Sequence, residues 1–114
     1  MKQNNEQDTR SIIELLMDFQ LTEVKAKIYI YLKKAGKATA EGIAKGAGIY
    51  ISSVREAIAE MYHEGLVKRE KMRKSGLGKP AYIYEAIHTQ TLVGRLTKNV
   101  KEKLDKLSKF LTNV

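Results

Sequence analysis

Polar residues near the middle of the 114-residue chain carry groups suited to recognition chemistry. Ser52, Ser53 and Arg55 lie close together, and Glu56 follows directly. Serine hydroxyls donate to phosphates or base edges, and a guanidinium pairs with guanine O6 and N7 or with a phosphate. Glu56 could accept from cytosine N4 or simply face solvent. The group therefore points to nucleic acid, although both serines could equally be ordinary residues at the start of a helix.

A second polar group concentrates positive charge between residues 66 and 87. Its basic members are Lys68, Arg69, Lys71, Arg73, Lys74 and Lys79. Only Glu70 and Glu85 oppose these six cations, which leaves a net charge of +4. Cations at this density repel one another without a counter-charge, so we predict contact with phosphates. The alternative is that an exposed hairpin is rich in lysine only to remain soluble.

The elements that position these residues begin with a helix-turn-helix between Thr39 and Leu66. Thr39 is a suitable N-cap for a short helix, and Gly46 and Gly48 allow the positive φ values of a sharp turn. A longer helix over residues 51–64 follows, with apolar residues at helical spacing at Val54, Ala57, Ile58 and Met61. This pattern predicts the layout of a recognition helix.

The pattern changes from helical to extended after Gly65. Residues 66–72 and 81–87 are candidate strands, and the second is rich in the β-branched and aromatic residues that strands favour. Two strands joined by a basic loop, directly after a helix-turn-helix, make a wing over residues 66–87. We predict a mainly α fold with a small β-hairpin (α+β). Its parts are an N-terminal tail and short helix (1–20), a winged helix-turn-helix domain (21–88) and a C-terminal helix (89–114).

The terminal helices carry apolar stripes. Ser11 and Glu14 have capping-box spacing, which predicts that the N-terminal helix starts there. The C-terminal helix has apolar residues in heptads, as in a coiled coil. The predicted dimer interface consists of Val93, Thr97, Val100, Leu104, Leu107 and Leu111. Such a helix must pack on its own domain or on another chain.

Several functional classes are excluded by what the sequence lacks. There is no cysteine, and His63 and His88 are isolated, so no metal site is expected. No paired carboxylates suggest a catalytic cleft, and Gly76-Leu77-Gly78-Lys79 has no helix after it to form a phosphate-binding loop. We therefore expect neither an enzyme nor a cofactor.

The overall charge favours a polyanionic partner. The chain has 21 Lys and Arg against 13 Asp and Glu, a net charge of +8 and a sequence pI near 9.7. No apolar run is long enough to span a membrane, and the N-terminal residues lack a signal-peptide core. These features predict a cytoplasmic protein without a membrane partner.

Four short segments resemble the DNA-binding domain of TrmB-like archaeal transcriptional regulators, winged-helix relatives of the MarR group. They are Leu21-Thr22-Glu23-Val24-Lys25-Ala26-Lys27-Ile28-Tyr29, Gly36-Lys37-Ala38-Thr39-Ala40, Ile43-Ala44 and Gly65-Leu66-Val67. The resemblance covers roughly residues 15–84 and implies a cytoplasmic regulator that binds duplex DNA as a dimer. This chain departs from the family pattern with Lys25 in place of an acid, Gln20 in place of Gly, and Tyr50-Ile51 in place of a Pro and a basic residue.

Together these observations predict a dimeric DNA-binding transcriptional regulator. Candidate DNA-binding residues are Thr39, Tyr50, Ser52, Ser53, Arg55, Glu56, Lys68, Arg69, Lys71, Arg73, Lys74 and Lys79. The large sugar-binding domain of longer family members has no counterpart here, so no small-molecule ligand is expected. One alternative is a protein-interaction module of the transcription machinery, because residues 49–65 carry three acids and one basic residue. Another is a sequence-independent chromatin protein.

Overall fold

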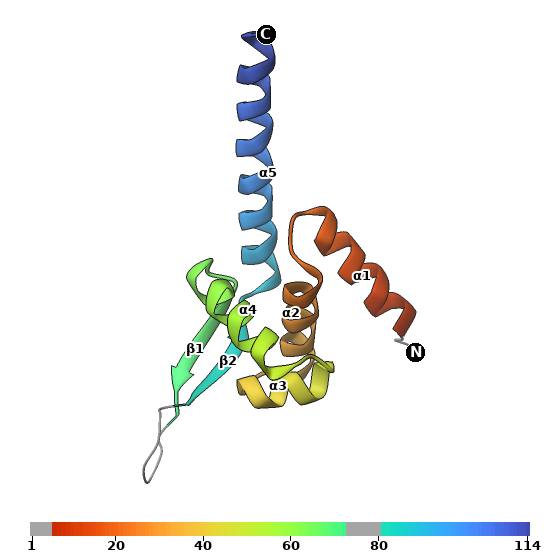
Figure 1. Cartoon of the computed structure of the whole chain (residues 1–114), viewed down its shortest axis with the longest axis vertical. Coiled ribbons are helices and arrows are strands. Elements are labelled where there is room, and N and C mark those ends of the chain that lie inside the picture. The colour runs from red at the N-terminus through yellow and green to blue at the C-terminus, as the bar shows by residue number, and fades with distance from the viewer. Residues whose placement is uncertain (1–5, 73–80) are drawn as a thin grey trace.

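The computed structural model describes residues 6–72 and 81–114 of the chain. Its elements, in order along the described residues, are α1 (Glu6–Asp18), α2 (Glu23–Ala35), α3 (Ala40–Ala47), α4 (Ile51–His63), β1 (Val67–Lys71), β2 (Tyr82–Ala86) and α5 (Thr89–Thr112). Helices α2, α3 and α4 form the body of the molecule (Figure 1). The β1–β2 hairpin extends from its lower side and α5 rises from the other. The predicted winged helix-turn-helix with a long C-terminal helix is confirmed.

Two threonines begin their helices as the sequence predicts. The hydroxyl of Thr22 accepts from the backbone N–H of Lys25 at 3.2 Å, and that of Thr39 accepts from Gly42 at 3.1 Å. The predicted start of α1 is wrong, because the helix begins at Glu6 and Ser11 lies within it. Asp8 in the first turn carries the negative charge that suits a helix N-terminus, which favours the earlier start.

The two glycines of the helix-turn-helix serve different purposes. Gly48 ends α3 in the left-handed conformation, with φ +70°, and its N–H donates to the carbonyl of Ala44. Gly46 is helical instead, so the prediction of a positive φ there is wrong. A Cβ at Gly46 would lie 2.3–2.5 Å from ring atoms of Tyr31. Gly46 is therefore required for the close approach of α3 to α2.

The main hydrophobic core lies where α2, α3 and α4 meet. Its most buried large side chains are Ile28, Leu32, Ile43, Val54 and Met61. Ala38 joins the hairpin to the body, because its backbone exchanges hydrogen bonds with Tyr84 at 3.0 and 2.8 Å. The buried hydroxyl of Tyr29 donates to the carbonyl of Ile87 at 2.8 Å, and burial raises the pKa of this phenol.

The hairpin has a regular antiparallel register. Val67 pairs with Ala86, Arg69 with Tyr84 and Lys71 with Tyr82. The strands are one residue shorter at each end than predicted, which leaves the predicted wing in place. Arg73, Lys74 and Lys79 lie outside the described residues.

Among the described residues, helix α5 packs on the body through its first turns. Leu92 and Leu96 are buried in the main core, whereas every residue from Lys101 onward is exposed. The predicted heptad positions Leu104, Leu107 and Leu111 belong to this exposed part. Figure 1 shows the C-terminal half of α5 standing clear of the other elements.

Candidate nucleic-acid interface

The N-terminus of α4 presents an exposed turn to solvent. Tyr50 is 84% exposed, and Ile51 and Ser52 are also exposed, whereas Ser53 is half-buried. Tyr50 occupies the N-cap position without making a side-chain capping hydrogen bond. The backbone N–H groups at the start of a helix carry partial positive charge and suit an anion such as phosphate.

Arg55 lies on the same exposed side of α4 but is held by α3. Its Nη2 donates to Oε2 of Glu41 at 2.7 Å, and both side chains are largely exposed. A pair this exposed adds little stability. It does, however, fix the direction of the guanidinium and sets a carboxylate beside it. The adjoining Glu56 is exposed and forms no ion pair with any residue in the described ranges.

The negative charge at the C-terminal end of α4 is partly neutralised by Lys25 of α2. Lys25 of α2 is largely buried, and its Nζ lies 2.9 Å from Glu60 and 3.1 Å from Glu64. Burial lowers the pKa of this ammonium, but the hydrogen bonds to Glu60 and Glu64 outweigh that effect and raise it above its ordinary value. The acidic character of residues 49–65 is therefore much weaker in the fold than in the sequence.

The basic residues of the hairpin are divided between its two faces. Side chains alternate along a strand, so Arg69 and Lys71 share the face of Tyr82, and Lys68 lies on the other. Lys68 and Lys71 are exposed. The guanidinium of Arg69 lies 3.9 Å from the ring centre of Tyr62 and 4.1 Å from that of Tyr82.

The predicted DNA-binding residues gather only in part. The first turn of α4 and the hairpin lie toward the end of the molecule away from the α5 C-terminus (Figure 1). Thr39 is half-buried, and its hydroxyl is already engaged in capping α3. Sequence reasoning missed the roles of Glu41, Lys25 and Tyr62, because each acts through a partner on another helix or strand.

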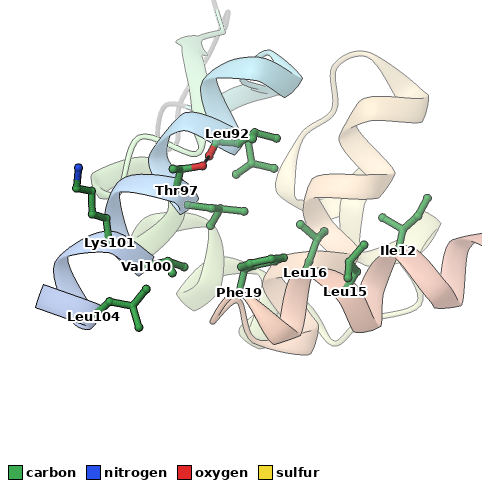
Figure 2. Close-up of a pocket in the computed structure, with 11 residues that line it drawn as sticks. Ile12, Leu15, Leu16, Phe19, Leu92, Thr97, Val100, Lys101 and Leu104 are labelled. Atoms are coloured by element: carbon green, nitrogen blue, oxygen red, sulfur yellow. Dashed lines mark hydrogen bonds between the residues drawn. The ribbon is translucent and has the colours of Figure 1, made fainter. Parts of the chain in front are cut away.

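A separate apolar groove lies between α1 and α5. Its volume is about 550 Å³, and Figure 2 shows side chains of both helices facing it. The lining residues are Ile12, Leu15, Leu16, Phe19, Leu92, Val93, Leu96, Thr97, Val100, Lys101 and Leu104. The groove thus includes four predicted dimer residues, Val93, Thr97, Val100 and Leu104. Leu107 and Leu111 extend the apolar stripe beyond it.

Within the described ranges, no helix is long and apolar enough to cross a membrane. The same residues contain no group of three or more His, Cys, Asp or Glu placed to hold a metal ion. Neither observation adds a second kind of site to the surface formed by α4 and the hairpin.

A helix-turn-helix followed by a basic hairpin defines a winged-helix transcriptional regulator. The model of the family "Sugar-specific transcriptional regulator TrmB" matches residues 15–90, so the chain belongs to this family. The family consists of regulators, in agreement with the prediction that the chain is not an enzyme. No curated protein matches the chain by sequence.

Solved structures share the fold at low sequence identity. A possible transcriptional regulator from Methanosarcina mazei Go1 has 16% identity and a TM-score of 0.72, over 98% of this chain and 90% of that one. The archaeal chromatin protein TrmBL2, described with a novel mode of DNA binding, has 16% identity and a TM-score of 0.77. That match covers 92% of this chain but 38% of TrmBL2. A MarR family regulator from Silicibacter pomeroyi DSS has 15% identity and a TM-score of 0.54, over 92% and 61% of the two chains.

Proposed function

We propose that this winged-helix regulator binds duplex DNA as a homodimer, with the first turns of α4 in the major groove and the hairpin on phosphates. The observation that carries the proposal is the exposed turn from Tyr50 to Arg55, on a helix whose C-terminal end leads into a basic hairpin. Pairing of Glu60 and Glu64 with Lys25 supports it further, because one cation offsets part of the negative charge of the three acids in residues 49–65. A cytoplasmic location follows from this function.

The residues at the start of α4 have the chemistry for reading bases. Ser52 is exposed on the first turn, and Arg55 lies one turn later. Both are within the part of a recognition helix that usually reaches base edges. Tyr50 and Ser53 flank them and suit backbone contacts. Glu56 is assigned to cytosine N4, whose amino group it can accept from.

The basic hairpin residues have the chemistry for contacting phosphates. Lys68 and Lys71 are exposed on opposite faces, so both reach the DNA only if the hairpin enters a groove or lies along one edge-on. Phosphate contacts fix register and supply affinity without reading sequence. We also assign Arg73, Lys74 and Lys79, outside the described residues, to this role.

Salt dependence tests the proposal directly. If a dimer neutralises about 4–8 phosphates, log K should fall with log[salt] at a slope of roughly −4 to −7. Fluorescence anisotropy with labelled duplexes at two salt concentrations measures the slope. Replacing Ser52 or Arg55 by Ala should reduce the difference in binding free energy between specific and random duplexes, by about 1–3 kcal/mol for a base contact. Absence of duplex binding at low salt would contradict the proposal and favour a protein-interaction module.

The dimer is proposed to form through α5 and the groove beside it. Leu107 is 50% exposed and Leu111 63% exposed, and both continue the apolar stripe of the groove. Burying three or four such side chains contributes about 1.5–3 kcal/mol each. A second copy supplies a matching stripe, and a two-fold arrangement would set two α4 helices about 34 Å, or a multiple of that, apart.

A double substitution tests the dimer. Leu104→Asp with Leu107→Asp should give a folded monomer that loses most of its specific DNA affinity, because both residues are exposed in the single chain. Sedimentation gives the mass and circular dichroism checks the fold. Glu102→Gln, on a polar side of the same helix, is the matched control. A parent protein that is monomeric at micromolar concentration would contradict the dimer.

A sequence-independent chromatin protein is the second candidate. TrmBL2, which shares this fold, is described as a chromatin protein, and the exposed part of α5 is itself basic. Its basic residues from Lys98 onward are Lys98, Lys101, Lys103, Lys106 and Lys109. Equal affinity for all duplexes at each salt concentration would favour this candidate over a site-specific regulator.

A further inference from the structure

Arg69 joins the two parts of the proposed DNA-binding surface. Its guanidinium lies over the ring of Tyr62, at the C-terminal end of α4, and over the ring of Tyr82, at the start of β2. Arg69 itself belongs to β1. We call these three side chains the Arg69 stack. One cation thus contacts an aromatic ring on the recognition helix and another on the hairpin.

The hairpin register explains why the stack forms. Arg69 pairs with Tyr84 and Lys71 with Tyr82, so Arg69 and Tyr82 are diagonal neighbours on one face. Tyr84 on the same face is buried and holds the base of the hairpin against the body. Tyr82 lies two residues before Tyr84 on β2, and the Arg69 stack ties this part of the hairpin to Tyr62 of α4.

We propose that Arg69 is a positioning residue for DNA binding, fixing the angle between the hairpin and α4 through Tyr62 and Tyr82. The inference rests on the proposed function, because an angle between these elements matters only if both contact one partner. A guanidinium is planar and stacks on aromatic faces, which an ammonium does less well. A fixed angle means that less conformational freedom is lost when both elements bind.

The stack distinguishes Arg69 from its basic neighbours. A residue that only neutralises phosphate acts through charge, and removing it should flatten the salt slope by about 1. A residue that positions the hairpin acts through its rings, and losing either ring should weaken binding although every charge remains. Tyr62 and Tyr82 are therefore the informative sites, because their substitution leaves the charge of the surface unchanged.

Ring substitutions supply the DNA-binding test. Tyr62→Leu and Tyr82→Leu should each weaken duplex binding about 5-fold with an unchanged salt slope, as expected for one cation–π contact. Tyr62→Phe and Tyr82→Phe keep the ring and should bind like the parent. Arg69→Gln combined with Tyr62→Leu should bind no more weakly than Arg69→Gln alone. Lys68→Gln, on the other face of the hairpin, is the control for a pure phosphate contact.

An NMR measurement tests the stack without DNA. The side-chain protons of Arg69 should show upfield ring-current shifts that Tyr62→Leu and Tyr82→Leu each reduce and the Phe variants retain. Unshifted Arg69 protons in the parent would overturn the stack, and equal binding by the Leu variants would overturn its positioning role. Failure of the parent to bind any duplex, with the ring-current shifts present, would instead overturn the proposed function and leave the stack as a feature of the fold.

Discussion

Helices α4 and α5 have similarly spaced apolar residues, but the chain buries this apolar face in α4 and leaves most of it exposed in α5. In α4 the four apolar positions Val54, Ala57, Ile58 and Met61 are all buried within the chain. In α5 only Leu92 and Leu96 are buried, and Leu104, Leu107 and Leu111 beyond them are exposed. Apolar periodicity therefore specifies which face of a helix must be covered, but not whether the same chain covers it.

The largest expected effect is a difference in stability loss between Ala variants of buried Met61 and exposed Leu107. Met61→Ala should lower the free energy of unfolding by about 2–5 kcal/mol, because Met61 is fully buried and its removal leaves a cavity. Leu107→Ala, at protein concentrations where sedimentation shows a monomer, should cost less than about 0.5 kcal/mol. Urea unfolding followed by circular dichroism measures both. Equal losses would mean that the end of α5 packs within its own chain.

A second test asks how far charge, rather than apolar packing, holds α4. Lys25→Met keeps much of the packing volume but removes the ion pairs to Glu60 and Glu64. The loss of stability should be at most about 1 kcal/mol, because both carboxylates are half-exposed. DNA affinity should also fall, since the removal of one positive charge makes this end of α4 more negative. Lys27→Met, also on α2, is the control.

The stability that Lys25 contributes through Glu60 and Glu64 should depend on pH in a defined direction. The pKa of Lys25 is raised in the fold, so its contribution is complete below the unfolded pKa of about 10.5 and is lost as the pH rises through the higher folded value. The difference in unfolding free energy between the parent and Lys25→Met should therefore shrink above pH 10.5. Tyr29 titrates in both proteins and cancels in the difference. A difference that grows with pH would contradict the assignment.

A smaller effect, on DNA affinity, is expected from the ion pair between Arg55 of α4 and Glu41 of α3. Glu41→Gln removes the carboxylate that holds Arg55 and should raise duplex affinity by up to about 5-fold, because Arg55 becomes available to DNA. Anisotropy titrations measure the change, with Glu85→Gln on the hairpin as the control. A fall in specific affinity would mean instead that Glu41 orients Arg55 toward its base.

The smallest expected effect on stability concerns Gln20, in the turn that follows α1. Gln20 has φ +85°, the only positive φ among the described residues other than glycine. Gln20→Gly removes this backbone strain but frees the unfolded chain, for a net gain of about 0.5 kcal/mol. Thermal unfolding should show a slightly higher Tm, with Gln20→Ala unchanged or lower. In the burial of its apolar residues, α1 lies between α4 and α5, because Ile13 is buried and Ile12 is exposed.

Local signals in the sequence predicted most of the fold. Thr22 and Thr39 act as caps, the apolar residues of α4 face the core, and β2 forms where β-branched and aromatic residues cluster. These features depend on neighbours within a few residues. Gly46 was misinterpreted because its reason, the ring of Tyr31, comes from another helix.

The candidate site was less predictable because its side chains are set by distant partners. Arg55 was predicted from its helix alone, but its direction depends on Glu41, fourteen residues earlier. The three acids of residues 49–65 supported the alternative of a protein-interaction module, yet Lys25 pairs with two of them across 35 and 39 positions. Sequence reasoning named Arg69 for its charge, whereas its geometry is set by two tyrosine rings.

The bond between Tyr29 and Ile87 has a mechanical consequence. Only Ile87 and His88 separate β2 from α5, and the carbonyl of Ile87 is held by the buried hydroxyl of Tyr29 at 2.8 Å while its N–H donates to Leu66. The link between the hairpin and α5 is therefore clamped rather than hinged. We therefore expect that a tilt of α5 also moves the hairpin, because Tyr29 of α2 holds the link between them in place.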